Sequence, residues 1–159
     1  MLKWLWLSLV LFAGDQASKL WVVANFDLYE SKALLPSLNF TYVHNTGAAF
    51  SFLSSAGGWQ RWFFVGIALV ASITLIIWLS RLKLSERWMA VTLSLILGGA
   101  IGNLFDRISY GYVIDFIDVY YQAWHWPVFN IADCAIFIGV VMMLFDTFFG
   151  QTDSGSNSK

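Results

Sequence analysis

Four apolar stretches, each long enough to cross a lipid bilayer, constrain this chain more than any other feature. A helix needs roughly 20 mostly apolar residues to span the hydrocarbon core. Only 12% of the 159 residues are charged, against about 25% in a typical soluble domain, and mean hydropathy is +0.66. These features predict a mainly α integral membrane protein, a four-helix bundle with spans at about 2–24, 60–79, 88–107 and 129–149.

The first stretch also has features of a secretory signal peptide, because Lys3 precedes an apolar run. The run does not end at a small-residue cleavage site, and apolar residues resume at 20–26. We therefore interpret residues 2–24 as an uncleaved span. Residues 1–150 then form a single membrane-embedded domain, and we expect the polar tail 151–159 to be disordered.

The basic residues predict how the spans are oriented, because cytoplasmic loops carry an excess of Lys and Arg. Five of the nine basic residues lie at the two ends of the chain and in the short loop between the second and third spans, Lys3, Arg81, Lys83, Arg87 and Lys159, against Lys32, Arg61 and Arg107 on the other side. This bias places both termini in the cytoplasm. The two longer connections, 25–59 and 108–128, then face outward.

The two outer connections differ in pattern. Residues 38–45, LNFTYVHN, alternate apolar and polar side chains as a half-buried strand does, and TGAAFSF follows with Gly47 available for a turn. We expect 25–59 to form a small outward-facing β cradle. The aromatic-rich segment 108–128 is predicted to be an interfacial loop, and we expect the two segments to close over a site between them.

Several kinds of chemistry have no support in the sequence. A net charge of −1 excludes a strong nucleic-acid footprint, which needs a basic patch. Cys134 is the only cysteine and lies in an apolar run, so we interpret it as a buried, inert thiol. The chain has no HExxH motif, GxSxG elbow or glycine-rich phosphate loop. We expect neither a metal nor a cofactor.

Ionisable residues at membrane depth are costly and usually mark a functional site. This chain offers seven: Asp15, Lys19, Asp106, Arg107, Asp115, Asp133 and Asp146. Asp15 and Lys19 share a helix face, which fits either an ion pair that eases burial or an Asp that braces polar groups in the bundle. Arg107 fits either snorkelling to water or pairing with a carboxylate, and we favour the pairing.

The remaining carboxylates also have two interpretations each. Asp133 fits a helix cap, although it enters an apolar run too deeply for an ordinary one. Asp115 fits either a solvated loop carboxylate or half of a catalytic pair with Asp133. Asp118 is better interpreted as a solvated loop carboxylate. We expect Asp146 to be interfacial. Gly98 and Gly102 form a GxxxG step, which predicts close helix packing and no chemistry.

Two neighbouring carboxyl groups are sufficient for peptide hydrolysis. They cannot both ionise easily, so one keeps a proton while the other stays charged. The charged group takes a proton from the attacking water, and the protonated group protonates the departing amine. If the chain is an enzyme, an acid pair is the chemistry for which it has adequate residues.

Five blocks of sequence, in order, resemble the lipoprotein signal peptidase (signal peptidase II) family. They are DQASK at 15–19, NTGAAF at 45–50, GGAIGNLFDR at 98–107, VIDF at 113–116 and FNIAD at 129–133. The resemblance covers essentially the whole chain except the polar tail. It implies an aspartyl endopeptidase of the bacterial inner membrane, with its active site near the outer face.

The resemblance also implies roles for individual residues and partners. Asp115 and Asp133 would be the catalytic dyad. Asn45, Asn103, Arg107, Asn130 and Asp15 would bind substrate or support the dyad. The substrate would be a prolipoprotein with a diacylglyceryl cysteine, cut just before that cysteine. Membrane lipids and inhibitors of the globomycin and myxovirescin types would be the other partners.

Two other classes fit the intramembrane charges without the resemblance. A small proton-coupled transporter also uses such residues, but four spans without a visible inverted repeat make a poor transporter, and most polar residues lie toward the outer half. A membrane assembly protein would use them to join helices. The residues alone leave the three classes about equal, and the resemblance favours the peptidase.

Overall fold

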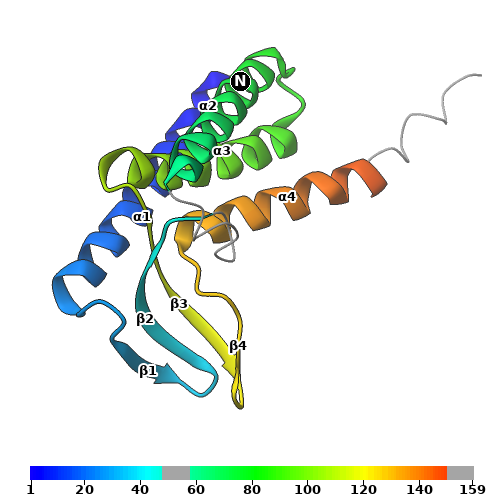
Figure 1. Ribbon diagram of the computed structural model, residues 1–159. Helices are drawn as coiled ribbons and strands as arrows, with labels where there is room; N and C mark the ends of the chain where they lie inside the picture. The colour runs from blue at the N-terminus through cyan, green and yellow to red at the C-terminus, as the bar shows by residue number, and fades with distance from the viewer. Residues whose placement is uncertain (48–57, 150–159) are drawn as a thin grey trace, which may run out of the picture.

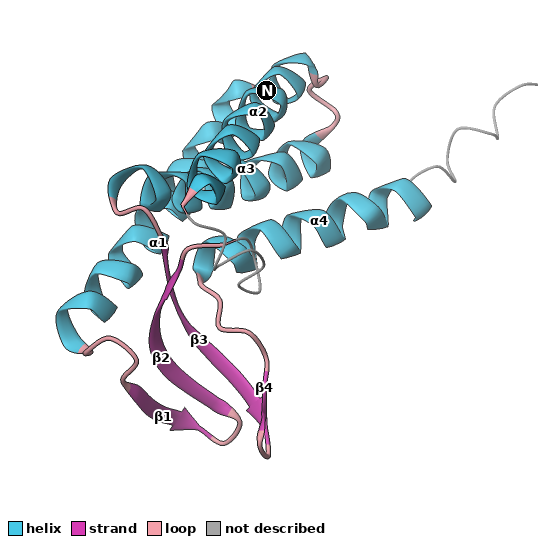
Figure 2. Cartoon of the chain, viewed as in Figure 1, coloured by secondary structure: helices cyan, strands magenta, loops and turns pink. Residues whose placement is uncertain are grey.

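The computed structural model describes residues 1–47 and 58–149, arranged as helices with a small sheet at one end (Figures 1 and 2). The elements are a 3-10 turn η1 (Leu2–Trp4), α1 (Leu5–Asn25), β1 (Ser31–Leu35), β2 (Leu38–Asn45), α2 (Trp59–Arg81), α3 (Arg87–Ser109), β3 (Val113–Tyr121), β4 (Trp124–His125) and α4 (Ile131–Phe149). The predicted disordered tail, and residues 48–50 of the NTGAAF block, lie outside the described residues.

All four predicted spans are helices of the expected length. The segments long and apolar enough to cross a membrane are Leu2–Asn25, Trp59–Arg81, Arg87–Ser109 and Ile131–Phe149. Their ends agree with the sequence prediction to within about two residues. The four-helix membrane architecture predicted from the apolar stretches is therefore confirmed.

Helix α3 is the central helix, because it packs against α1, α2 and α4. Its glycines make this closeness possible. A Cβ added at Gly98 would lie 3.0 Å from the backbone oxygen of Ser8 on α1, and one at Gly99 would clash with the backbone oxygen of Ala132 on α4. The predicted small-residue packing is present, and it brings the start of α4 against the C-terminal half of α3.

The sheet is antiparallel, with strand order β1-β2-β3-β4. Strands β2 and β3 pair from Leu38 opposite Val119 to Asn45 opposite Val113. The cradle prediction is confirmed, but the segment predicted as an interfacial loop is part of the same sheet. Strands β2 and β3 are hydrogen-bonded neighbours, so the described parts of the two connections form one sheet; the predicted closure over the site stays a prediction, because residues 48–57 lie outside the described residues.

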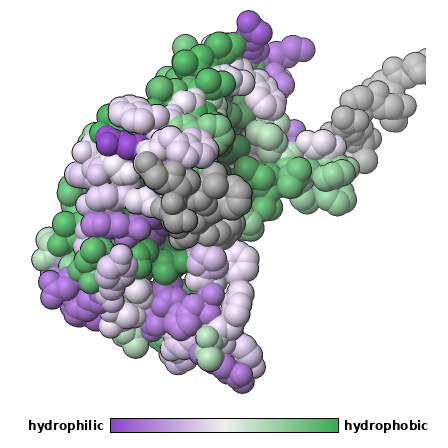
Figure 3. All heavy atoms as spheres, viewed as in Figure 1, coloured by the Kyte–Doolittle hydropathy of each residue, from purple (hydrophilic) through white to green (hydrophobic). Residues whose placement is uncertain are grey.

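An apolar cluster joins the sheet to the outer end of α1. Val22 and Phe26 pack against Tyr42, Ile114 and Phe116. Hydrophobic side chains cover most of the helical surface in view, whereas polar side chains gather on the sheet (Figure 3). The cluster fixes β3 beside α3 and α4, which places Asp115 next to the beginning of α4.

Candidate active site

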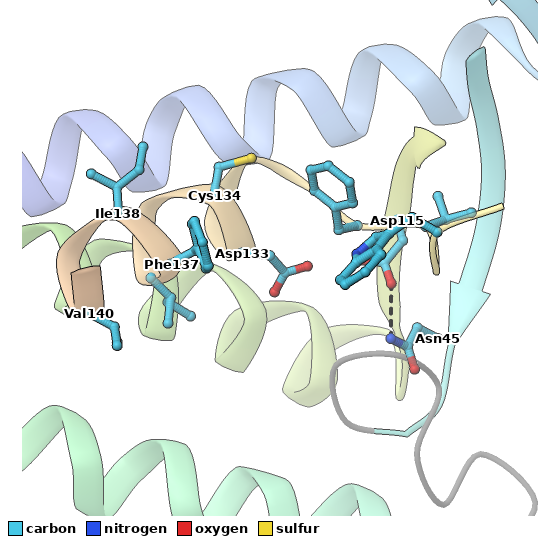
Figure 4. Close-up of a pocket in the computed structure, with 11 residues that line it drawn as sticks. Asn45, Asp115, Asp133, Cys134, Phe137, Ile138 and Val140 are labelled. Atoms are coloured by element: carbon cyan, nitrogen blue, oxygen red, sulfur yellow. Dashed lines mark hydrogen bonds between the residues drawn. The ribbon is translucent and has the colours of Figure 1, made fainter. Parts of the chain in front are cut away.

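The side chains of Asp115 on β3 and Asp133 on α4 line one cavity of about 610 Å³ (Figure 4). In the close-up, the Asp133 carboxylate points toward the side of the pocket where Asp115 accepts a hydrogen bond from Asn45. The rest of the lining is almost wholly apolar: Trp126, Val128, Phe129, Cys134, Ile136, Phe137, Ile138 and Val140. Two carboxylates therefore lie at the polar end of a hydrophobic cavity.

Asp133 is held by the start of its own helix. Asn130 precedes α4, and its Oδ1 accepts a hydrogen bond from the Asp133 backbone N–H at 3.0 Å. In return, Asp133 Oδ2 accepts one from the Asn130 backbone N–H at 3.2 Å. This is a reciprocal capping arrangement. Asp133 is the third residue of α4 and so is not an ordinary N-cap, as predicted, but it shares a reciprocal cap with Asn130 and also lines the cavity.

Asp115 is held by two side-chain amides. Asn45 Nδ2 donates to its Oδ2 at 2.9 Å, and Asn130 Nδ2 donates to its Oδ1 at 2.6 Å. Burial and, next, the neighbouring charge of Asp133 raise the pKa of Asp115 to about 7. The two amide donors oppose this rise because they favour the ionised form. A carboxyl with this pKa is able to hold a proton near neutral pH.

Two asparagines connect the carboxylates. Asn130 reaches Asp115 through its side chain and Asp133 through its backbone N–H. Asn103 on α3 donates from Nδ2 to Asp133 Oδ1 at 2.8 Å, and its Oδ1 accepts from Asn130 Nδ2 at 3.2 Å. The predicted site residues Asn45, Asn103 and Asn130 thus all lie against the two carboxylates.

A second buried cluster lies next to this pair. Lys19 Nζ is 2.8 Å from Asp15 Oδ2 and 2.8 Å from Asp106 Oδ2, and all three side chains are almost completely buried. Lys19 also donates to Asn103 Oδ1 at 3.2 Å, which orients the Asn103 amide toward Asp133. The predicted ion pair of Asp15 and Lys19 is present, and Lys19 also contacts Asn103, one of the predicted site residues.

The carboxylates of this second cluster anchor the backbone immediately before each cavity carboxylate. Asp15 Oδ1 accepts from the backbone N–H of Ala132, one residue before Asp133. Asp106 Oδ2 accepts from the backbone N–H of Ile114, one residue before Asp115. Asp106 and Lys19 were among the seven ionisable candidates of the sequence analysis, but neither was assigned a role in the site. Their signal was the i, i+4 spacing of DQASK together with a third buried charge in the GNLFDR block.

Arg107 differs from expectation. Its guanidinium donates from Nη2 to the backbone oxygen of Gly47 at 2.8 Å and from Nη1 to that of Asn103 at 3.2 Å. It also lies 5.4 Å from the ring centre of Phe64. Within the described residues it forms no ion pair with a carboxylate. Arg107 instead fixes the chain at Gly47, two residues after Asn45, to the end of α3.

Asp118 corrects another prediction. It is not a solvated loop carboxylate, because it lies on β3 with 4% of its surface exposed. Asn39, Thr41 and His125 all hydrogen-bond to its carboxylate. Burial alone would raise the pKa of Asp118, but these three partners together hold it below its ordinary value. Asp146 is partly exposed near the far end of α4, as an interfacial role requires.

Cys134 is half-buried and lines the cavity beside Asp133 (Figure 4). The sequence analysis expected a buried, inert thiol, whereas the structure leaves Cys134 partly exposed to the cavity. Over residues 1–47 and 58–149, no three His, Cys, Asp or Glu side chains come together as a metal site would require. The chemistry that the cavity itself offers is that of two carboxyl groups.

Comparison with known proteins identifies the family. The model of the family described as signal peptidase (SPase) II matches residues 7–149. A lipoprotein signal peptidase from Pseudoalteromonas translucida is 57% identical over 151 residues, covering 95% of this chain and 91% of that protein. One from Shewanella amazonensis is 54% identical over 147 residues, covering 92% and 88%. These matches confirm the resemblance inferred from the five sequence blocks.

Solved structures agree with the fold. A bacterial membrane enzyme determined by the in meso method at 2.3 Å resolution superposes with a TM-score of 0.85, is 28% identical and is covered to 93%, with 99% of this chain matched. A second, at 1.9 Å, gives a TM-score of 0.81 and 30% identity, with 94% of each chain covered. The chain belongs to the signal peptidase II family, the multi-pass membrane proteases that remove signal peptides from prolipoproteins.

Proposed function

We propose that this protease is of the aspartic type and that Asp115 and Asp133 are its catalytic dyad. The observation that carries the proposal is the position of Asn130, which donates to Asp115 at 2.6 Å from its side chain and to Asp133 at 3.2 Å from its backbone. One residue therefore holds both carboxylates at the wall of one cavity. Each accepts hydrogen bonds from two donors, which fix its orientation.

The dyad works with one proton shared between two carboxyl groups. Burial and the charge of Asp133 raise the pKa of Asp115 to about 7, so one proton stays on the pair near neutral pH. The ionised carboxyl takes a proton from water as it attacks the scissile carbonyl. The protonated carboxyl then protonates the departing amine. Asn45, Asn103 and Asn130 keep both groups in place through these transfers.

The substrate is a prolipoprotein whose cysteine already bears a diacylglyceryl group, and the cut falls just before that cysteine. The cavity supports this assignment because it runs from the two carboxylates along α4, past Phe137, Ile138 and Val140. Such a surface suits acyl chains and the apolar side chains of a signal peptide. Inhibitors of the globomycin and myxovirescin types would occupy the same cavity across the dyad.

The protein lies in the bacterial inner membrane with both termini in the cytoplasm. The basic residues at Lys3 and in the loop between α2 and α3 support this orientation. The sheet and the dyad are then at the outer face, where the end of a translocated signal peptide emerges. The bilayer supplies substrate laterally to the apolar cavity.

The test is cleavage of a diacylglyceryl-modified prolipoprotein by the purified full chain in detergent and lipid. Asp115→Asn and Asp133→Asn keep the shape of each side chain but remove the acid–base group. We expect each to lower kcat by at least about 1,000-fold. A folded variant that keeps more than a tenth of the turnover would refute the dyad.

Two matched variants control for indirect effects. Asp146→Asn changes a carboxylate on the same helix as Asp133 but at its partly exposed far end, and it should leave kcat unchanged. Cys134→Ser removes the thiol beside Asp133 and should retain turnover. If Cys134→Ser is inactive while the two Asn variants cut the substrate, the protease uses its cysteine and the proposal fails.

A further inference from the structure

Asp118 is a buried carboxylate for which the dyad chemistry has no use. It lies on β3, three residues after Asp115, with 4% of its surface exposed. Asn39 Nδ2 and Thr41 Oγ1, both from β2, donate to its Oδ2 at 3.2 and 3.0 Å. Burying a carboxylate costs free energy unless hydrogen bonds compensate for the lost water. The donors around Asp118 therefore indicate that this residue has a role in positioning the structure around it.

The remaining oxygen of Asp118 is bonded to His125. His125 Nδ1 lies 2.8 Å from Asp118 Oδ1, and the ring stacks on Tyr120 with 5.2 Å between centres. Since an ionised carboxylate only accepts, Nδ1 carries the hydrogen of this bond. His125 is half-exposed, with 52% of its side chain accessible. This hydrogen bond therefore connects the half-exposed His125 of β4 to the buried Asp118 of β3.

The segment that follows His125 forms one wall of the cavity. Trp126, Val128 and Phe129 line it together with Asp115 and Asp133. At one end the wall is fixed by backbone bonds between Phe129 and β3. At the other it is fixed by the bond from the Trp126 N–H to the Val119 oxygen and by the His125 side chain. Pro127, between the two ends, has no N–H to add.

We propose that the hydrogen bond from His125 to Asp118 positions the wall Trp126–Phe129 against the apolar part of the prolipoprotein. Asp118 and His125 are then positioning residues for substrate binding, and they do not take part in the proton transfers. The proposal rests on the proposed function, because the wall belongs to the same cavity as the dyad. The apolar part in question is either an acyl chain or a signal-peptide side chain.

Two substitutions of His125 separate its hydrogen bond from its stacking. His125→Asn keeps a side-chain donor at about the position of Nδ1, whereas His125→Phe keeps an aromatic ring against Tyr120 and loses the donor. Because the residue is half-exposed, neither change empties a core. We expect His125→Phe to raise KM by roughly 3- to 10-fold with kcat nearly unchanged, and His125→Asn to stay near the wild type.

A companion measurement does not depend on turnover. Hydrogen exchange of the full chain in detergent should show faster exchange of the Trp126 amide in His125→Phe than in the wild type or His125→Asn. Unchanged exchange and unchanged KM would overturn the proposal, and so would a fall in kcat with KM unchanged. If the wild type proves inactive, the proposed function fails, yet the exchange result still decides whether the bond holds the wall.

Substrates with long and short acyl chains distinguish the two apolar groups. A KM penalty that shrinks with the short-chain substrate assigns the wall to the lipid, and an equal penalty assigns it to the signal peptide. Asp27→Asn is the matched control, because Asp27 is an exposed carboxylate in the turn before β1. It should alter neither KM nor exchange. An equal KM rise in Asp27→Asn would mean that surface charge, and not the positioned wall, controls binding.

Discussion

Two pairs of carboxylates, all buried except the partly exposed Asp133, lie side by side in this protein and are stabilised in different ways. Asp15 and Asp106 share a cation, since Lys19 is 2.8 Å from each. Asp115 and Asp133 are instead held by neutral amides of Asn45, Asn103 and Asn130. A nearby cation and amide donors both favour the ionised form of a carboxylate, but at Asp115 burial and the charge of Asp133 outweigh the amide donors.

The difference matches the part that each pair plays. Asp15 and Asp106, which share Lys19, accept hydrogen bonds from the backbone N–H groups of Ala132 and Ile114 and so support the site structurally. Asp115 and Asp133 face the cavity, where the proposed reaction requires one of them to hold and release a proton. The site also lowers the stability of the fold near neutral pH. Because the pKa of Asp115 lies above its ordinary 3.8, the contribution of this group to the free energy of unfolding falls as pH rises from about 4 to 7.

Removing the shared cation should have the largest effect on stability. Lys19→Met leaves two buried carboxylates without compensation, and breaking a buried ion pair in this way costs about 3–5 kcal/mol. We expect a large fall in the thermal unfolding midpoint in detergent. Lys19→Met combined with Asp15→Asn and Asp106→Asn should recover part of the loss. No recovery in the triple variant would show that packing of the Lys19 stem, and not charge, was the cause.

Changing one neutral donor should move the pH dependence of catalysis. The one-proton form of the dyad is lost as pH rises through the pKa of Asp115 at about 7, so kcat/KM falls on the alkaline side of that value. Asn45 donates to Asp115 and favours its ionised form. Asn45→Leu should therefore shift the alkaline limb of the kcat/KM profile to higher pH by roughly 0.5–1 unit.

The control for this shift lies on the same strand. Asn39→Leu removes an amide of β2 that donates to Asp118 and not to Asp115, so the alkaline limb should stay in place. A limb that moves to lower pH in Asn45→Leu, or that moves equally in both variants, would mean that the limb does not report on Asp115.

The sequence predicted the parts of this architecture that have a local signal. Long apolar runs defined the four spans, and the alternation in LNFTYVHN predicted β2. Strand β3 was missed because Val113 to Phe116 are all buried, so the segment lacks the alternation of a half-buried strand. Its aromatic end was read instead as an interfacial loop.

The contacts that were missed join residues far apart in the chain. Asp118 is buried by Asn39 and Thr41, which are 79 and 77 residues away, and nothing near Asp118 in the sequence indicates them. Lys19 and Asp106 are likewise brought together only by the packing of α1 on α3. The reciprocal cap of Asn130 and Asp133 was readable from their spacing, but the apolar run around Asp133 argued against it.

Asp118 shares features with both pairs, because it bonds to the neutral donors Asn39 and Thr41 and to the ring of His125. Removing one of these hydrogen bonds should have the smallest effect on stability. Asn39→Ala removes one of its donors, at a cost of about 1 kcal/mol near neutral pH. Because the folded pKa of Asp118 is below the ordinary 3.8, its stabilising effect is present above that value and is lost as pH falls through the folded pKa. The difference in stability between wild type and Asn39→Ala should therefore shrink in acid.

Unfolding midpoints at pH 7 and pH 3 measure this difference, with exposed Asn25→Ala as the control expected to show little change at either pH. A difference that persists undiminished at pH 3 would mean that Asn39 supports the sheet through packing and that the Asp118 charge is not what it stabilises.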